Sequence, residues 1–288
     1  MENVLEVRNL RKRFEGFALT DVTFSVPRGH IMGLIGPNGA GKTTTLKLIL
    51  DLVKRDSGEI LVRGLDPAEH GAQVRSQVGF VHDEPKFYRH LTLAQNAALV
   101  AHFYRNWEEV AFRRLAAAFE LPLGKRFGVC SRGNRKKFAL ALALSHKAEL
   151  ILMDEPTSGL DPVFRRGLLD TLSALLQDER VSVLFSTHIT ADLERISDYI
   201  TLLQGGRVIF SSVKDRIMEN WGLVKGGLEL LDGLPAGFFR GVRRSAHGFE
   251  ALTEDAAETR RRFGGSVLVE RPSLEDIVCY TFRGEAHD

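Results

Sequence analysis

Short, largely apolar runs alternate along much of the chain with longer segments of helical periodicity. The apolar runs are bounded by turn-forming residues, as is typical of buried strands, and they cover residues 31–35, 78–81, 150–153 and 181–185. Between them, apolar residues recur at the three- and four-residue spacing of helices, over residues 42–52, 93–104, 107–119, 133–144 and 163–176. Strands and helices that alternate in this way favour an α/β core built on a parallel sheet.

Two segments near the N-terminus, residues 4–10 and 21–26, instead alternate apolar and polar positions. Such alternation is typical of strands with one buried and one solvated face. We therefore expect an antiparallel β edge, with a further strand at 59–62. Helical periodicity dominates between about residues 85 and 145, which predicts a helical subdomain inserted into the core.

The pattern changes after Gly205-Gly206. Residues 211–288 contain glycine pairs and short strand-like pieces, with a strand predicted at 266–270 and a helix at 254–263. Ser273 has an N-cap pattern that opens a final short helix. Since domains average roughly 150 residues, we expect two parts: an α/β domain over residues 1–210 and a small α+β accessory domain over residues 211–288.

The composition is that of a folded globular protein, with 44% hydrophobic and 26% charged residues. The formal net charge of +2 gives no support to nucleic-acid binding. The two cysteines, Cys130 and Cys279, suggest no disulfide framework and fit a reducing compartment. No apolar run approaches the roughly 18–20 residues of a membrane-spanning helix, and no signal peptide is recognisable, so a cytoplasmic location is expected.

The segment from Gly36 to Thr44 fits the pattern G-x-x-x-x-G-K-[ST] of phosphate-binding loops. It follows a predicted strand and opens a predicted helix, which is the context that the motif requires. Glycines let successive N–H groups point at phosphate oxygens, the lysine binds the β- and γ-phosphates, and the hydroxyl after it binds Mg²⁺. The residues expected to hold the nucleotide are Gly36, Asn38, Gly39, Gly41, Lys42, Thr43 and Thr44.

The apolar run at 150–153 ends in two carboxylates, Asp154 and Glu155. Alone this is a weak signal, because solvated acids often follow a strand. Downstream of a phosphate-binding loop it indicates catalysis. Asp154 is placed to hold Mg²⁺ opposite Thr43, and Glu155 is placed to act as general base on the attacking water.

A third motif runs from Cys130 to Lys137 and opens a predicted helix. Ser131 is placed as its N-cap, and Gly133 leaves backbone N–H groups exposed at the helix start. This arrangement predicts a second anion site in the same chain. The alternatives are a capped surface helix, or a nucleic-acid patch formed by the basic residues Arg132, Arg135, Lys136 and Lys137.

Together these motifs resemble those of the ATP-binding subunit of an ABC transporter, over residues 4 to about 210. The loop from Asn38 to Thr44 has the family's form, and Ser131-Arg132-Gly133-Asn134 resembles its signature motif. The stretch from Asp154 to Pro162 resembles its acidic strand end and D-loop. The resemblance implies ATP and Mg²⁺ as ligands and gives roles to three more residues: Phe14 as the ring that stacks on adenine, His188 as the γ-phosphate sensor, and Asp161 as a contact across a dimer face. Asp161 is also placed as the N-cap of the next helix.

Asp83 departs from the family pattern, which has glutamine at this strand end. Its carboxylate is expected to meet Mg²⁺ or its water and to report γ-phosphate and Mg²⁺ occupancy to a transmembrane permease. The competing interpretation makes Asp83 a turn residue before Pro85 and gives the metal role to Glu84. The signature also departs from the family at Arg132 and Asn134.

The resemblance implies the ATPase of an ABC exporter, coupled to a separate transmembrane permease at the inner face of the cell membrane. Two copies, or one copy and a second ATPase subunit, are expected to close on ATP. Each ATP would lie between Lys42 of one chain and Ser131 and Gly133 of the other. The alternative is a soluble ABC-type ATPase that acts on nucleic acid or ribosomes. The near-zero net charge and the single phosphate-binding loop favour the transporter.

Overall fold

The computed structural model describes residues 2–176, 179–235 and 237–284. An antiparallel sheet in the order β2-β1-β4 comes first; its strands are β1 (Asn3–Phe14), β2 (Phe17–Pro27) and β4 (Ser57–Val62). β1 and β2 are longer than predicted, because their pairing continues, with irregular register, to Phe14 opposite Phe17. The expected antiparallel edge is confirmed.

The central sheet has the strand order β5-β6-β7-β3-β8-β9. The pairs β5–β6, β6–β7, β7–β3 and β3–β8 are parallel, and β9 is antiparallel to β8. β3, β6 and β7 are buried along their whole length, as strands covered on both faces must be. The strands are β3 (Ile31–Ile35), β5 (Val78–Val81), β6 (Leu150–Asp154), β7 (Ser182–Thr187), β8 (Tyr199–Gln204) and β9 (Arg207–Val213).

The register of this sheet brings three strand ends level. Ile35 at the end of β3 pairs with Thr187 at the end of β7, and Asp154 at the end of β6 pairs with Ser186. The segments that follow β3, β6 and β7 therefore meet at one edge, where ligands of open α/β sheets bind. This arrangement confirms the predicted parallel α/β core.

Four helices connect the strands of this core: α1 (Lys42–Ile49), α2 (Pro67–Gln77), α6 (Pro162–Leu175) and α7 (Thr190–Ile196). α1 ends before the predicted residue 52, and the chain reverses at Asp51, whose φ of 55° is left-handed. The sequence pattern missed α2, which is weakly amphipathic and buries only Pro67 and Val74.

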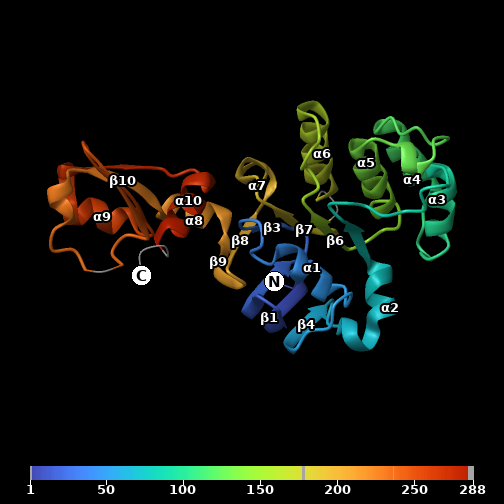
Figure 1. The fold of residues 1–288 in the computed structure, drawn as a ribbon, viewed down its shortest axis with the longest axis horizontal. Coiled ribbons are helices and arrows are strands. Elements are labelled where there is room, and N and C mark those ends of the chain that lie inside the picture. The colour runs from blue at the N-terminus through green and yellow to red at the C-terminus, as the bar shows by residue number, and fades with distance from the viewer. Residues whose placement is uncertain (1, 177–178, 236, 285–288) are drawn as a thin grey trace.

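The predicted helical block lies to one side of the core (Figure 1). It contains α3 (Leu93–Ala101), α4 (Glu109–Ala118) and α5 (Arg132–Ala143). Phe112 and Phe138 connect it to the main hydrophobic core, and both are buried. No helix in the described ranges is both long and apolar enough to span a membrane.

The C-terminal part extends on the opposite side of the core in Figure 1. β9 crosses residue 210, where composition suggested a boundary, and ends at Val213. α8 (Lys214–Asn220) leads to an antiparallel sheet in the order β11-β12-β10-β13. The remaining elements are β10 (Gly222–Gly226), β11 (Gly241–Ser245), β12 (Gly248–Thr253), α9 (Ala256–Phe263), β13 (Val267–Glu270) and α10 (Leu274–Gly284). Residues 285–288 of the expected accessory domain lie outside the described residues.

α10 packs this part against the core. The backbone N–H of Leu274 donates to Glu194 Oε1 on α7 at 2.5 Å. Leu274, Ile277 and Tyr280 belong to the same buried cluster as Leu193 of α7. The C-terminal part is therefore joined to the core by apolar packing as well as by the chain itself.

Candidate functional site

The loop between β3 and α1 has three positions where the backbone requires glycine. Gly39 and Gly41 have φ values of 82° and 106°, a region that side chains disfavour. A Cβ on Gly36 would lie 2.2 Å from the carbonyl oxygen of Leu203. The three glycines of the motif thus meet physical requirements of this turn, and α1 begins directly after it at Lys42.

A hollow of about 510 Å³ opens over this loop, lined by Phe17, Pro37, Asn38, Gly39, Gly41, Lys42, Thr43, Thr44, Asp83 and Glu155. Most of the residues predicted to hold the nucleotide therefore share one surface. Gly36 is not part of the described lining, but the Lys42 ammonium donates to its carbonyl at 2.8 Å and to that of Pro37 at 3.2 Å. Burial lowers the pKa of Lys42, against the opposing influence of Glu155 and Asp154.

Asp154 lies directly opposite the first hydroxyl of α1. Thr43 Oγ1 donates to the Asp154 carboxylate, 2.8 Å from Oδ2 and 3.1 Å from Oδ1. Ser186 Oγ donates to Oδ1 at 2.8 Å from the end of β7. Ser186 was not expected in the site. The sequence signal for it is its place directly before the Thr187-His188 pair.

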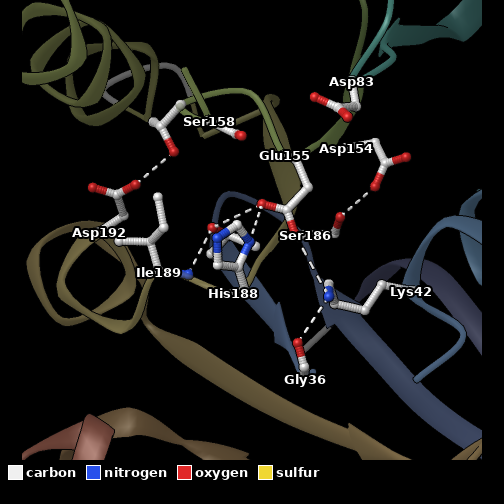
Figure 2. A network of polar contacts seen from close by, with 12 residues as sticks. Gly36, Lys42, Asp83, Asp154, Glu155, Ser158, Ser186, His188, Ile189 and Asp192 are labelled. Atoms are coloured by element: carbon white, nitrogen blue, oxygen red, sulfur yellow. Dashed lines mark hydrogen bonds and ion pairs between the residues drawn. The ribbon is translucent and has the colours of Figure 1, made fainter. Parts of the chain in front are cut away.

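Glu155 lies between a cation and a histidine, as Figure 2 shows. Its Oε1 is 3.5 Å from Lys42 Nζ, and its Oε2 is 2.8 Å from Nδ1 of His188. Its backbone has a left-handed φ of 47°, which is uncommon for a residue with a side chain. Its N–H donates to the Ser186 carbonyl at 2.9 Å. The side chain is 14% exposed and faces the hollow.

A buried carboxylate that the sequence reasoning missed supports the turn after Glu155. Asp192 on α7 accepts a hydrogen bond from Thr157 Oγ1 at 2.7 Å and pairs with Arg165 of α6 at 2.7 Å. Asp192 is 1% exposed and Thr157 is 2% exposed. These contacts connect the D-loop segment to α7, the helix that follows His188. No local sequence pattern predicts them.

Asp83 lines the hollow but pairs with the signature helix α5. Its Oδ1 lies 2.8 Å from Lys136 Nζ and 3.3 Å from Arg132 Nη2. Burial works against its ionisation, yet the hydrogen bond and charge of Lys136, together with Arg132, hold the pKa of Asp83 below its ordinary value. Glu84, the competing candidate, is absent from the described lining of the hollow.

Seven predicted residues lie outside that lining, as far as the described residues show: Phe14, Gly36, Ser131, Gly133, Asp154, Asp161 and His188. Ser131 caps α5, accepting from the N–H of Asn134 at 3.2 Å. Asp161 caps α6, accepting from the N–H of Phe164 at 2.9 Å. His188 also lies beside the hollow and reaches it through Glu155.

The aromatic ring that lines the hollow is Phe17, while Phe14 is 40% exposed nearby on the β1–β2 hairpin. The ammonium of Lys12 lies 5.6 Å from the centre of the Phe14 ring. Two rings are therefore candidates to stack on an adenine base: Phe17 in the lining of the hollow, and the exposed Phe14 on the same hairpin.

The residues fit a magnesium nucleotide. The glycine loop forms a cradle for phosphates, and Thr43 and Asp154 place a hydroxyl beside a carboxylate. Within the part of the chain that the structure describes, no group of three or more His, Cys, Asp or Glu could hold a metal ion. Mg²⁺ takes one or two carboxylates together with substrate phosphates and waters, and Asp154 provides one such carboxylate beside the Thr43 hydroxyl.

Comparison with known proteins agrees with this geometry. The family model described as ABC transporter matches residues 19–158, and a model of an AAA domain matches residues 126–191. The chain is 31% identical to the uncharacterized ABC transporter ATP-binding protein YhcH of Bacillus subtilis (strain 168), over 76% of this chain and 73% of that protein.

Two further relatives have more specific names. The probable multidrug ABC transporter ATP-binding protein YbhF of Escherichia coli (strain K12) is 35% identical, over 74% of this chain and 38% of YbhF. The sulfate/thiosulfate import ATP-binding protein CysA of Burkholderia mallei (strain ATCC 23344) is 38% identical, over 71% of this chain and 61% of CysA. The matched region thus spans less than two thirds of these two relatives. The chain has a phosphate-binding loop that faces two acidic residues, and it has these relatives. It therefore belongs to the ATP-binding proteins of ABC transporters and is an ATPase.

Proposed function

We propose that this chain powers an exporter: it hydrolyses ATP with Glu155 as general base and passes the resulting movement to a separate transmembrane permease. The observation that carries the catalytic part is the position of Glu155, whose carboxylate lies between Lys42 and His188 at the wall of the hollow. A base needs a carboxylate held toward the reacting phosphate and an ordered partner that keeps it there.

Each side chain has a distinct task in this proposal. Lys42 binds the β- and γ-phosphates, and the N–H groups of the loop hold the remaining oxygens. Glu155 takes the proton of the attacking water, and His188 fixes the direction of the Glu155 carboxylate. Thr43 and Asp154, with Asp83 at the same wall, would hold Mg²⁺, which offsets the negative charge of the phosphates when bound.

The signature helix supplies the other half of the site from a second copy of the chain, or from a related ATPase subunit. The N-terminus of α5, a helix of 12 residues, presents Ser131 and Gly133, and a helix N-terminus favours an anion. Neither residue lines the described hollow of its own chain. We therefore place them, with Asp161, across the ATP of a partner in a head-to-tail dimer.

The family and the named relatives support a separate permease, and with it a position at the inner face of the cell membrane. YbhF is named for multidrug transport and CysA for import. The two names therefore do not give one direction of transport, and export is our own proposal. The test is to identify a polytopic membrane protein that co-purifies with this chain and to reconstitute the two together into vesicles. ATP-driven movement of cargo away from the ATPase side supports export, and movement toward that side overturns it.

A further inference from the structure

Lys136 is a lysine whose side chain is only 2% exposed. It lies on α5, just beyond Ser131 and Arg132. The sequence offered it only as part of a basic surface patch, but its burial excludes that interpretation. A buried ammonium costs folding free energy unless it is paired and hydrogen-bonded, so its partners indicate what its burial achieves.

The partners of Lys136 use all three donors of the ammonium group. Nζ donates to the backbone carbonyl of Glu155 at 2.7 Å and to that of Ser158 at 2.8 Å. It pairs with Asp83 Oδ1 at 2.8 Å. One side chain from the signature helix thus contacts Glu155 directly after β6, Ser158 in the turn that follows, and Asp83 two residues after β5.

Glu155 needs this support, because its backbone is in the left-handed region, with a φ of 47°. Such a conformation persists only where the surroundings fix it. The Glu155 N–H is fixed by the Ser186 carbonyl at 2.9 Å, and its C=O is fixed by Lys136. The two contacts hold the backbone on either side of the Cα that carries the base.

Asp83 supplies the counter-charge for Lys136. The Asp83 side chain is 33% exposed, and Arg132, which is 57% exposed, makes the weaker contact at 3.3 Å. The two carbonyls can accept hydrogen bonds from Lys136 but carry no net charge. Removal of the Asp83 carboxylate would therefore leave a buried cation without its counter-ion, which is costly.

We propose that Lys136 is a positioning residue for Glu155, that it holds the catalytic carboxylate in place through the backbone, and that Asp83 acts on catalysis through Lys136. This inference rests on the proposed role of Glu155 as base. It gives the aspartate that replaces the family's glutamine a task specific to this chain: the Asp83–Lys136 pair couples the signature helix to the base.

The test compares Lys136→Met, Lys136→Arg, Asp83→Asn and the double variant Asp83→Asn/Lys136→Met. The matched control is Lys147→Met, because Lys147 pairs with Glu108 at 2.6 Å but is 65% exposed. Three quantities are measured: kcat at saturating Mg²⁺ and ATP, the Kd for ATP without Mg²⁺, and the Tm of the nucleotide-free protein.

Displacement of a catalytic group by about 1 Å costs on the order of 100-fold, so Lys136→Met should lower kcat about 10- to 100-fold while the Kd for ATP stays unchanged. Lys136→Arg should restore part of the lost rate. Asp83→Asn should lower kcat less than Lys136→Met does. The double variant should match Lys136→Met, because Asp83 acts through a side chain that is then absent. Lys136→Met and Asp83→Asn should each lower the Tm, and the double variant should lower it by less than the sum of the two. Lys147→Met should behave as wild type.

Losses of kcat that multiply in the double variant overturn the proposal, as does a wild-type kcat in Lys136→Met or an equal loss in Lys147→Met. If Lys136→Met does not fold, Asp83→Asn decides: a wild-type kcat in that variant overturns the proposal. Full turnover by Glu155→Gln would instead overturn the role of the base itself. An inactive Glu155→Gln beside a fully active Lys136→Met would overturn this inference alone.

Discussion

Glu155 Oε2 lies 2.8 Å from Nδ1 of His188. An ionised carboxylate only accepts hydrogen bonds, so an ionised Glu155 pairs with the Nδ1–H tautomer of His188, which leaves Nε2 for a ligand. His188 is 48% exposed, whereas Glu155 is 14% exposed. The histidine can therefore contact a nucleotide while it orients the carboxylate beside it.

Replacement of Glu155 by glutamine removes the proton acceptor but keeps the shape of the side chain. We expect Glu155→Gln to bind ATP as wild type does and to lose about 10²- to 10⁴-fold in kcat, the range typical of general bases. Phosphate release and the Kd for ATP measure the two effects separately. Hydrolysis at the wild-type rate would show that another group is the base.

His188→Ala removes the group that orients Glu155, so kcat should fall here too. Because the two residues act as a unit, the double variant Glu155→Gln/His188→Ala should be no slower than Glu155→Gln alone. Single-turnover rates of the three variants measure this. A further loss in the double variant would assign His188 a role independent of Glu155.

The proposed dimer predicts a change of size with nucleotide. Glu155→Gln should elute as a dimer with ATP and Mg²⁺ and as a monomer without ATP, because slow turnover preserves the bridging γ-phosphate. Adding Ser131→Arg should keep the protein monomeric under both conditions, since a long side chain would block the start of α5. Size-exclusion chromatography with light scattering measures this. The dimer is contradicted if Glu155→Gln binds ATP but stays monomeric both in isolation and in the presence of the permease.

Phe14 and Phe17 compete for the role of the ring that stacks on adenine. The resemblance favours Phe14, and Phe17 lines the hollow. Stacking is worth roughly 1–3 kcal/mol per base at most, so loss of the correct ring should raise the KM for ATP by about tenfold. Comparison of Phe14→Ala and Phe17→Ala identifies it. An unchanged KM in Phe14→Ala with a raised KM in Phe17→Ala reassigns the role.

Asp83 is also predicted to contribute to the Mg²⁺ requirement, because a carboxylate binds this ion more strongly than an amide does. Asp83→Asn should raise the Mg²⁺ concentration that gives half-maximal ATPase activity. Glu84→Gln is the matched control. A shift in Glu84→Gln alone would transfer the metal role to Glu84.

Features that depend on local chain geometry could be predicted from the sequence. The loop from Gly36 to Thr44 is specific because left-handed and crowded backbone positions require glycine at Gly39, Gly41 and Gly36. Asp154 and Glu155 follow an apolar run that can only be a buried strand here, so their place at the sheet edge was predictable. The caps at Ser131 and Asp161 were also predictable, because a cap bonds only three residues ahead.

The distant residues that complete the site could be identified only from the folded chain. Ser186 contacts Asp154 because β6 and β7 lie in register, and Phe17 reaches the hollow because the β1–β2 hairpin folds beside the loop. The pairing of Asp83 with Lys136 depends on how α5 packs against β5, far along the chain. Such contacts are set by the burial of apolar surface between whole elements, whose relative placement no local pattern specifies. Lys136, which the sequence offered only within an alternative basic patch, therefore lies against the backbone of Glu155.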